Sequence, residues 1–108
     1  MTLDPSTFVE KLTEDLIGSA PEDVQVMVVG SEPLRNQLME LQRDVREGLE
    51  AVLRGGLIEA LERRLRDRKT DIVAAAPDHN FTIERLVARA IEDTLKAARL
   101  AREEASRG

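Results

Sequence analysis

Hydrophobic residues recur at helical spacing in three stretches of the chain. From Pro5 to Ile17, apolar side chains return every three or four residues behind Asp4, the expected N-cap, and proline is favoured at the first position of a helix. A longer stretch of the same kind runs from Pro33 to Lys69, and a third runs from Ile83 to Glu104 behind Thr82, the expected N-cap. Because a glycine costs about 1 kcal/mol inside a helix, we predict that the middle helix is kinked or broken at Gly55 and Gly56.

Two short apolar runs do not follow the helical spacing. Val24 to Val29 consists mostly of β-branched valine and lies between Pro21 and Gly30. Ile72 to Ala76 is a similar run that ends at Pro77. Short apolar runs bounded by glycine or proline are typical of strands, and their continuous apolar character indicates that both faces are covered. We therefore predict two short strands.

The order of these elements predicts a helix-rich α/β fold with the succession helix, strand, kinked helix, strand, helix. Two strands joined by a helical crossover would be parallel. A sheet of two short strands is too small to be stable alone, so we expect dimerisation to complete it. Residues 1–104 would form a single domain, and residues 105–108 would form a frayed C-terminal tail.

The composition excludes several kinds of chemistry. The 108 residues include no cysteine, tryptophan or tyrosine and one histidine, which excludes disulfides, thiolate nucleophiles and zinc sites built on cysteine. We expect no cofactor and no bound metal. The N-terminal stretch mixes acidic with apolar residues, unlike a signal peptide, and no apolar run is long enough for a membrane span. We therefore expect a cytoplasmic location and no membrane partner.

The net charge of −5 is unevenly distributed along the chain. Residues 1–32 carry seven acidic side chains against one lysine, whereas residues 33–69 carry nine basic against seven acidic side chains. The one basic cluster consists of Arg63, Arg64, Arg66, Arg68 and Lys69. It would bind the phosphates of a nucleic acid, or it would place cations at a helix C-terminus, where the helix dipole favours them. The overall acidity of the chain favours the second interpretation.

A candidate ligand site follows from the ends of the two predicted strands. In a parallel sheet, ligands bind beyond the carboxyl ends of the strands, where helix N-termini attract anions. The residues there that would contact a phosphate or carboxylate are Ser31, His79, Asn80 and Thr82. The same residue types also serve as helix caps and turn residues. His79 stands beside Asp78, but no cysteine or second histidine completes a catalytic set, so we expect no enzyme.

The apolar stripe of the middle helix is the candidate interface. Leu34, Leu38, Leu41 and Val45 recur at gaps of three or four residues, as in a core-facing helix or a coiled-coil seam. We therefore predict a small non-enzymatic interaction or regulatory protein that works as a homodimer or binds another protein. The alternatives are a sensory domain that binds an anionic small molecule at the two loops, and a nucleic-acid-associated protein that uses the basic cluster.

Overall fold

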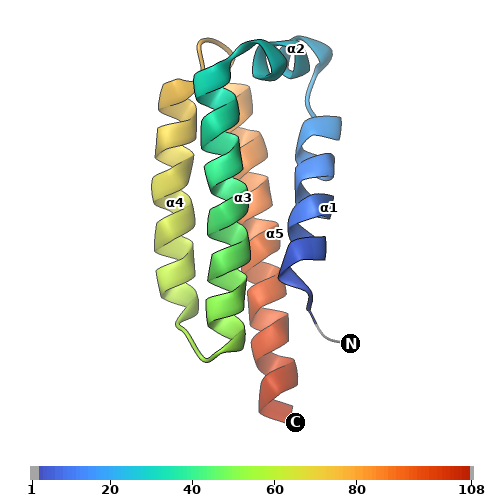
Figure 1. The fold of residues 1–108 in the computed structure, drawn as a ribbon, viewed down its shortest axis with the longest axis vertical. Coiled ribbons are helices and arrows are strands. Elements are labelled where there is room, and N and C mark those ends of the chain that lie inside the picture. The colour runs from blue at the N-terminus through green and yellow to red at the C-terminus, as the bar shows by residue number, and fades with distance from the viewer. Residues whose placement is uncertain (1–2, 108) are drawn as a thin grey trace.

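The chain folds into five α-helices in the computed structural model, which describes residues 3–107 and contains no strand within them (Figure 1). The helices are α1 (Pro5–Gly18), α2 (Glu22–Gly30), α3 (Glu32–Leu53), α4 (Ile58–Ala75) and α5 (Asn80–Arg107). The predicted α/β fold with a two-stranded sheet is therefore wrong, and the fold is all-α. None of these helices is long and apolar enough to cross a membrane.

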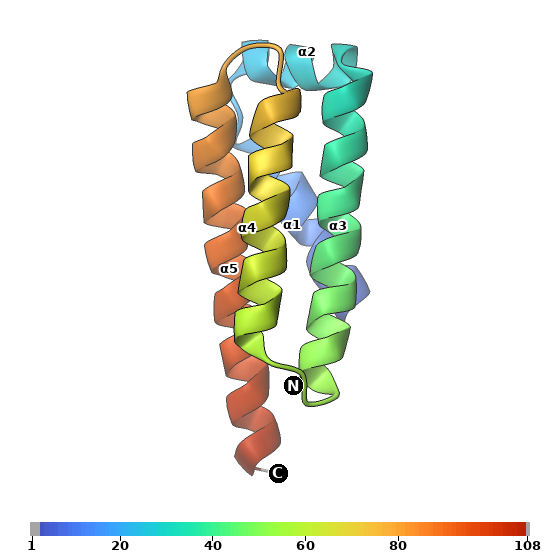
Figure 2. The ribbon, with the colours of Figure 1, turned by 90° about the vertical axis from the view of Figure 1, so that its left-hand side faces the viewer.

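Four of the helices lie side by side along the long axis of the molecule, which measures 46 × 23 × 19 Å. Helices α3 and α5 run in one direction, and α1 and α4 run in the opposite direction (Figures 1 and 2). Both α1 and α4 pack against α3 and α5, on opposite sides of that pair. Helix α2 lies across one end of the bundle, between α1 and α3 (Figure 2). Short loops between successive long helices make them antiparallel neighbours.

The core is aliphatic and is formed by one stripe from each long helix. The stripe of α3 is buried except at Leu38, which is partly exposed, as the spacing of its leucines and valines predicted. The fully or almost fully buried side chains that fill the centre are Leu34, Val45, Leu49, Leu65, Ile72, Ile83, Val87, Ile91 and Leu95. Because aromatic residues are so scarce, close packing of these branched side chains supplies most of the hydrophobic stabilisation.

The first predicted helix is confirmed, with its expected N-terminal cap. The side chain of Asp4 accepts a hydrogen bond from the backbone N–H of Ser6 at 3.1 Å, and Pro5 occupies the first helical position. The helix ends at Gly18, one residue beyond the predicted end.

The run from Val24 to Val29 belongs to helix α2 and is not a strand. Val24 and Val28, four residues apart, are buried, whereas Val26 and Val29 are exposed, which is helical and not alternating burial. Short apolar runs do not distinguish strand from helix by themselves. The informative signal was the preceding segment, in which a proline is followed by two acidic residues that favour the N-terminal end of the helix dipole.

The run from Ile72 to Ala76 likewise forms no strand, because Ile72–Ala75 is the last turn of α4 and Ala76 is its C-cap. No glycine or proline interrupts the chain between Gly56 and Pro77, so the helix continues through this run until the proline stops it. With neither predicted strand present, residues 3–107 contain no sheet for dimerisation to complete.

The middle helix is broken, and not merely kinked, at Gly55 and Gly56. Gly55 adopts a φ of 99°, which glycine tolerates at a helix end, and the N–H of Gly56 donates to the carbonyl of Ala51 at 2.8 Å. The chain reverses here, so the two halves of the predicted helix become the antiparallel neighbours α3 and α4.

The last helix begins at Asn80, so Thr82 lies in its first turn and does not cap it as predicted. The Asn80 side chain instead donates to the carbonyls of Val73 and Ala76, at 2.8 and 3.1 Å, and so satisfies acceptors at the end of α4. Helix α5 runs to Arg107, through most of the segment predicted to fray, and residue 108 lies outside the described residues.

Close packing between α3 and α4 depends on Gly48. A Cβ at this position would lie 2.3 Å from Cδ1 of Leu61, which is itself only 3% exposed. The absence of a side chain at Gly48 therefore allows the two helices to approach at this turn.

We predict that Gly48→Val lowers the free energy of unfolding by about 2 kcal/mol, because an overpacked core must displace Leu61 or separate the helices. Chemical denaturation at equilibrium measures this change. Ala60→Val, at an exposed position of α4, is the matched control and should cost only a few tenths of a kcal/mol, roughly the difference in helix propensity. Equal losses in the two variants would contradict the close approach.

Candidate functional site

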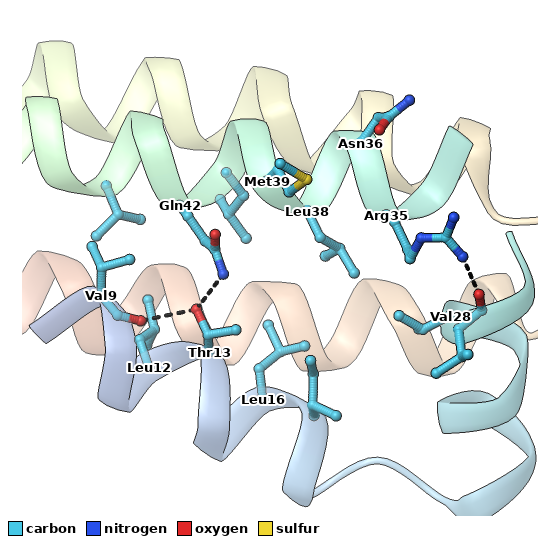
Figure 3. A pocket seen from close by; sticks show the side chains of 14 residues that line it. Val9, Leu12, Thr13, Leu16, Val28, Arg35, Asn36, Leu38, Met39 and Gln42 are labelled. Atoms are coloured by element: carbon cyan, nitrogen blue, oxygen red, sulfur yellow. Dashed lines mark hydrogen bonds between the residues drawn. The ribbon is translucent and has the colours of Figure 1, made fainter. Parts of the chain in front are cut away.

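The main apolar depression is a groove between α1 and α3 that α2 closes at one end (Figure 3). We call it the α1–α3 groove. Its volume is about 310 Å³, at the lower end of the range for ligand pockets. The apolar side chains that line it are Val9, Leu12, Leu16, Ile17, Val28, Val29, Leu38, Met39, Leu41 and Val45. Its polar lining consists of Thr13, Arg35, Asn36 and Gln42.

One hydrogen-bonded pair joins the two walls of the groove. Gln42 Nε2 donates to Thr13 Oγ1 at 2.9 Å, and the Thr13 hydroxyl donates to the carbonyl of Val9 at 2.8 Å (Figure 3). These bonds satisfy polar groups inside an otherwise apolar groove. They also show which turns of the two antiparallel helices lie at the same level.

Three large hydrophobic side chains at the edge of the groove are in contact with solvent. Ile17, Val29 and Met39 are 38%, 71% and 64% exposed, whereas Leu41 and Val45 in the floor are buried. Single exposed hydrophobic residues are common on protein surfaces. Three of them around one apolar groove are more typical of an interaction site.

The α1 wall of the groove carries acidic side chains. Glu10, Glu14 and Ile17 follow one another at gaps of four and three residues, so they share one face of α1. Ile17 lines the groove, and both glutamates are exposed. We call this stripe the acidic edge.

The α3 wall carries basic side chains in the corresponding place. Arg35, Met39, Gln42 and Arg46 follow one another at gaps of four, three and four residues, and the first three line the groove. Arg35 donates a hydrogen bond to the carbonyl of Val29, which holds its guanidinium near the α2 end (Figure 3). We call this stripe the basic edge.

The charged side chains of the two edges have no oppositely charged partner within the part of the chain that the structure describes. Among the described residues, no ion pair involves Glu10, Glu14, Arg35 or Arg46. The groove therefore has an apolar centre between two solvated edges of opposite sign.

A second polar feature is the buried carboxylate of Asp44, whose side chain is 3% exposed between α3 and α4. Arg64 Nε donates to one oxygen at 2.9 Å, and Arg68 Nε donates to the other at 2.8 Å. The side-chain hydrogen bond to Asp44 raises the pKa of Arg68. The bond to Glu47 raises the pKa of Arg64 and, reciprocally, lowers the pKa of Glu47. This cluster joins two helices, and its side chains do not line the α1–α3 groove.

The basic cluster, given as an alternative nucleic-acid site and otherwise expected at a helix C-terminus, lies in the middle of α4 and is divided by the helix period. Arg64 and Arg68 face α3 and pair with Asp44, while Arg66 pairs with Glu62 at 2.9 Å and Glu92 at 3.2 Å. Three of its five cations thus have carboxylate partners, and Arg63 and Lys69 complete the cluster. Phosphate binding would have to compete with these ion pairs.

The residues predicted to bind a ligand lie at the α2 end of the bundle but do not form one site. The Ser31 side chain accepts from Leu34 N–H as the N-cap of α3, and the Asn80 side chain is engaged with α4. His79 Nε2 lies 3.4 Å from an oxygen of Asp23. Asp23 and Ser31 are eight residues apart in α2, about 12 Å along its axis. Ser31 and His79 therefore belong to opposite ends of α2, and none of the four residues lines the α1–α3 groove or either of the two other depressions beside α1.

The stripe predicted as an interface has a double role. Leu34, Leu41 and Val45 are buried in the core of the chain, and Leu38 is partly exposed. Three of the four, Leu38, Leu41 and Val45, also line the α1–α3 groove. The exposed edge was not predicted from the sequence, although Met39, a large hydrophobic residue outside the stripe, signals a second apolar face on α3.

Two other depressions border α1. One, of about 410 Å³ but more open to solvent, lies between the start of α1 and the end of α5, and the other, of about 250 Å³, is largely polar. The larger one has a single strongly exposed hydrophobic residue, Leu100 at 51%. Within the described residues, no three histidine or carboxylate side chains gather into a possible metal site. The α1–α3 groove is thus the strongest candidate site.

We predict that Asp44→Asn lowers the free energy of unfolding by about 2 kcal/mol. Removing one partner of a buried ion pair costs about 3–5 kcal/mol, and partial exposure of both arginines reduces that figure because water can hydrate them. Thermal or chemical denaturation measures the change. Glu62→Gln, which removes an exposed ion pair within α4, should have a several-fold smaller effect. A larger loss from the Glu62 variant would show that Asp44 does not join α3 to α4.

Comparison with known proteins adds no identification. No protein-family model, no curated protein and no solved structure matches the chain. Function must therefore be inferred from the groove, its exposed hydrophobic residues and its charged edges.

Proposed function

We propose that the protein is a non-enzymatic interaction module that receives an amphipathic helix in the α1–α3 groove. The observation that carries this proposal is the cluster of exposed Ile17, Val29 and Met39 around a groove whose floor is already apolar. Laying the apolar face of a helix into a hydrophobic groove is a common mode of protein recognition. The two walls are themselves helices, so a third helix would pack against them as in a bundle.

The charged edges specify the chemistry of that helix. A helix in the groove would need an apolar stripe, with basic residues on the side near Glu10 and Glu14 and acidic residues on the side near Arg35 and Arg46. The groove follows α1, whose 14 residues extend about 21 Å, so it accommodates about four helical turns. The proposed partner is therefore a protein helix of mixed charge.

The other two hypotheses from the sequence have less support. The predicted anion site required a parallel sheet to bring its two loops together, and the described residues form helices and no sheet. The basic cluster has most of its charge in ion pairs. A cytoplasmic location remains a prediction from the sequence.

A labelled model peptide tests the proposal by fluorescence anisotropy. The peptide is a 14-residue helix with leucine at gaps of three and four, lysine along one edge of the stripe and glutamate along the other. We expect micromolar binding, weakened at least tenfold (about 1.4 kcal/mol) by Met39→Glu, because a charge in the contact opposes burial of the leucines. Leu57→Glu, at a residue of similar exposure in the α3–α4 loop, is the control and should bind as the wild type does. Equal binding of a scrambled peptide without the stripe would refute the proposal.

A further inference from the structure

We propose that the α1–α3 groove is covered by the same face of a second copy of this chain, in a dimer whose two-fold axis runs parallel to α1 and α3. This inference rests on the proposed function and names its partner. In this arrangement, α1 of each copy lies on α3 of the other, so each groove is covered by the equivalent surface of the other copy. Such a reciprocal contact requires a self-complementary surface.

The hydrogen bond between Thr13 and Gln42 fixes the levels that decide this complementarity. Ile17 lies four residues, about 6 Å, from Thr13, and Met39 lies three residues, about 4.5 Å, from Gln42. Because α1 and α3 are antiparallel, both displacements are toward α2 (Figure 1). The two exposed hydrophobic residues therefore face solvent at the same level of the groove.

The charged ends of the two edges also share a level, on the opposite side of the Thr13–Gln42 pair. Glu10 lies three residues, about 4.5 Å, from Thr13, and Arg46 lies four residues, about 6 Å, from Gln42, both away from α2. Across the groove, Glu10 and Ile17 of the acidic edge are thus level with Arg46 and Met39 of the basic edge.

A two-fold axis parallel to the helices exchanges the two edges and preserves their levels. It places Glu10 of one copy opposite Arg46 of the other, and Ile17 opposite Met39, each contact occurring twice. Glu50, one turn beyond Arg46, would lie level with Ser6 of the other copy and would meet no acidic residue of the acidic edge. Opposite charges then meet at one end of the shared apolar contact, on the side away from α2.

The alternative two-fold axis, in the same plane but perpendicular to the helices, is disfavoured by charge. It would lay α1 on α1 and α3 on α3, so that Glu10 and Glu14 of one copy approached the same glutamates of the other. Arg35 and Arg46 would approach each other in the same way. Facing like charges is unfavourable, so the distribution of charge selects the parallel axis.

The size of this face predicts a weak, reversible dimer. Two helices side by side are about 20 Å wide and share about 21 Å of length, which gives a face of about 400 Å² on each copy. Two such faces together fall below the roughly 1,200 Å² that stable complexes bury. We therefore expect dissociation in the micromolar range and not a permanent dimer.

Sedimentation velocity over about 1 to 500 µM protein tests the dimer. We expect the wild type to change from monomer to dimer within this range, and Met39→Glu to require at least tenfold higher concentration. Leu57→Glu is the matched control and should dimerise as the wild type does, because it introduces the same charge outside the groove. Circular dichroism should show all three folded, since both residues are largely exposed. A wild type that stays monomeric throughout, or a dimer that Met39→Glu does not weaken, overturns the inference.

Charge reversal tests the direction of the axis. Glu10→Arg and Arg46→Glu should each weaken self-association several-fold, since both place like charges at the two equivalent contacts. An equimolar mixture of the two variants should recover dimers, because both Glu10–Arg46 contacts then again hold opposite charges. A mixture that associates no better than either variant alone overturns the parallel axis.

The outcomes separate this inference from the proposed function. If the wild type is monomeric but binds the model peptide in a Met39-dependent way, the second copy is excluded and the interaction module stands. If the protein neither dimerises nor binds the peptide, both are wrong.

Discussion

Helix α3 is the element on which the structure depends, because every other helix packs against it. Its 22 residues extend about 33 Å and present three different faces to three long neighbours. One face contributes the aliphatic core, a second carries the polar contacts to α4, and a third faces α1. Because α1 is only about 21 Å long, it covers α3 incompletely. The α1–α3 groove lies along the part of the third face that runs beside α1, between Arg35 and Val45.

The contacts between α3 and α4 show how the helical period places basic residues that are close in the sequence on one face of α4. Arg64 and Arg68 are four residues apart on α4, so both reach the single carboxylate of Asp44. Burial of that carboxylate is tolerated because both oxygens accept hydrogen bonds from cations. A slip of α4 by one turn would move one arginine out of reach and leave the buried charge partly unpaired. The cluster that looked like a phosphate site therefore fixes the alignment of two helices.

The sequence predicted well those features that local spacing decides. It predicted α1 with its Asp4 cap, the α3 stripe and the α5 stripe. It failed for Val24–Val29, where β-branched residues favour a strand but contacts of two valines with the core favour a helix. It also failed for Ile72–Ala76, which was assigned separately from a helix that nothing interrupts. The groove could not be predicted, because it depends on the relative lengths and placement of helices far apart in the sequence.

The uneven distribution of charge along the chain becomes an uneven distribution of charge over the surface of the bundle. Most of the acidic excess of residues 1–32 belongs to α1 and α2, whereas the basic edge belongs to α3, and α1 and α3 are antiparallel neighbours. Within one chain the two edges flank the groove and do not form ion pairs across it. Both edges meet opposite charges only on a partner surface that carries the same two signs in exchanged order. A second copy turned about an axis parallel to the helices would present such a surface. The sequence predicted a homodimer because a two-stranded sheet needed completion, whereas the proposed dimer rests on complementary charge and exposed hydrophobic residues.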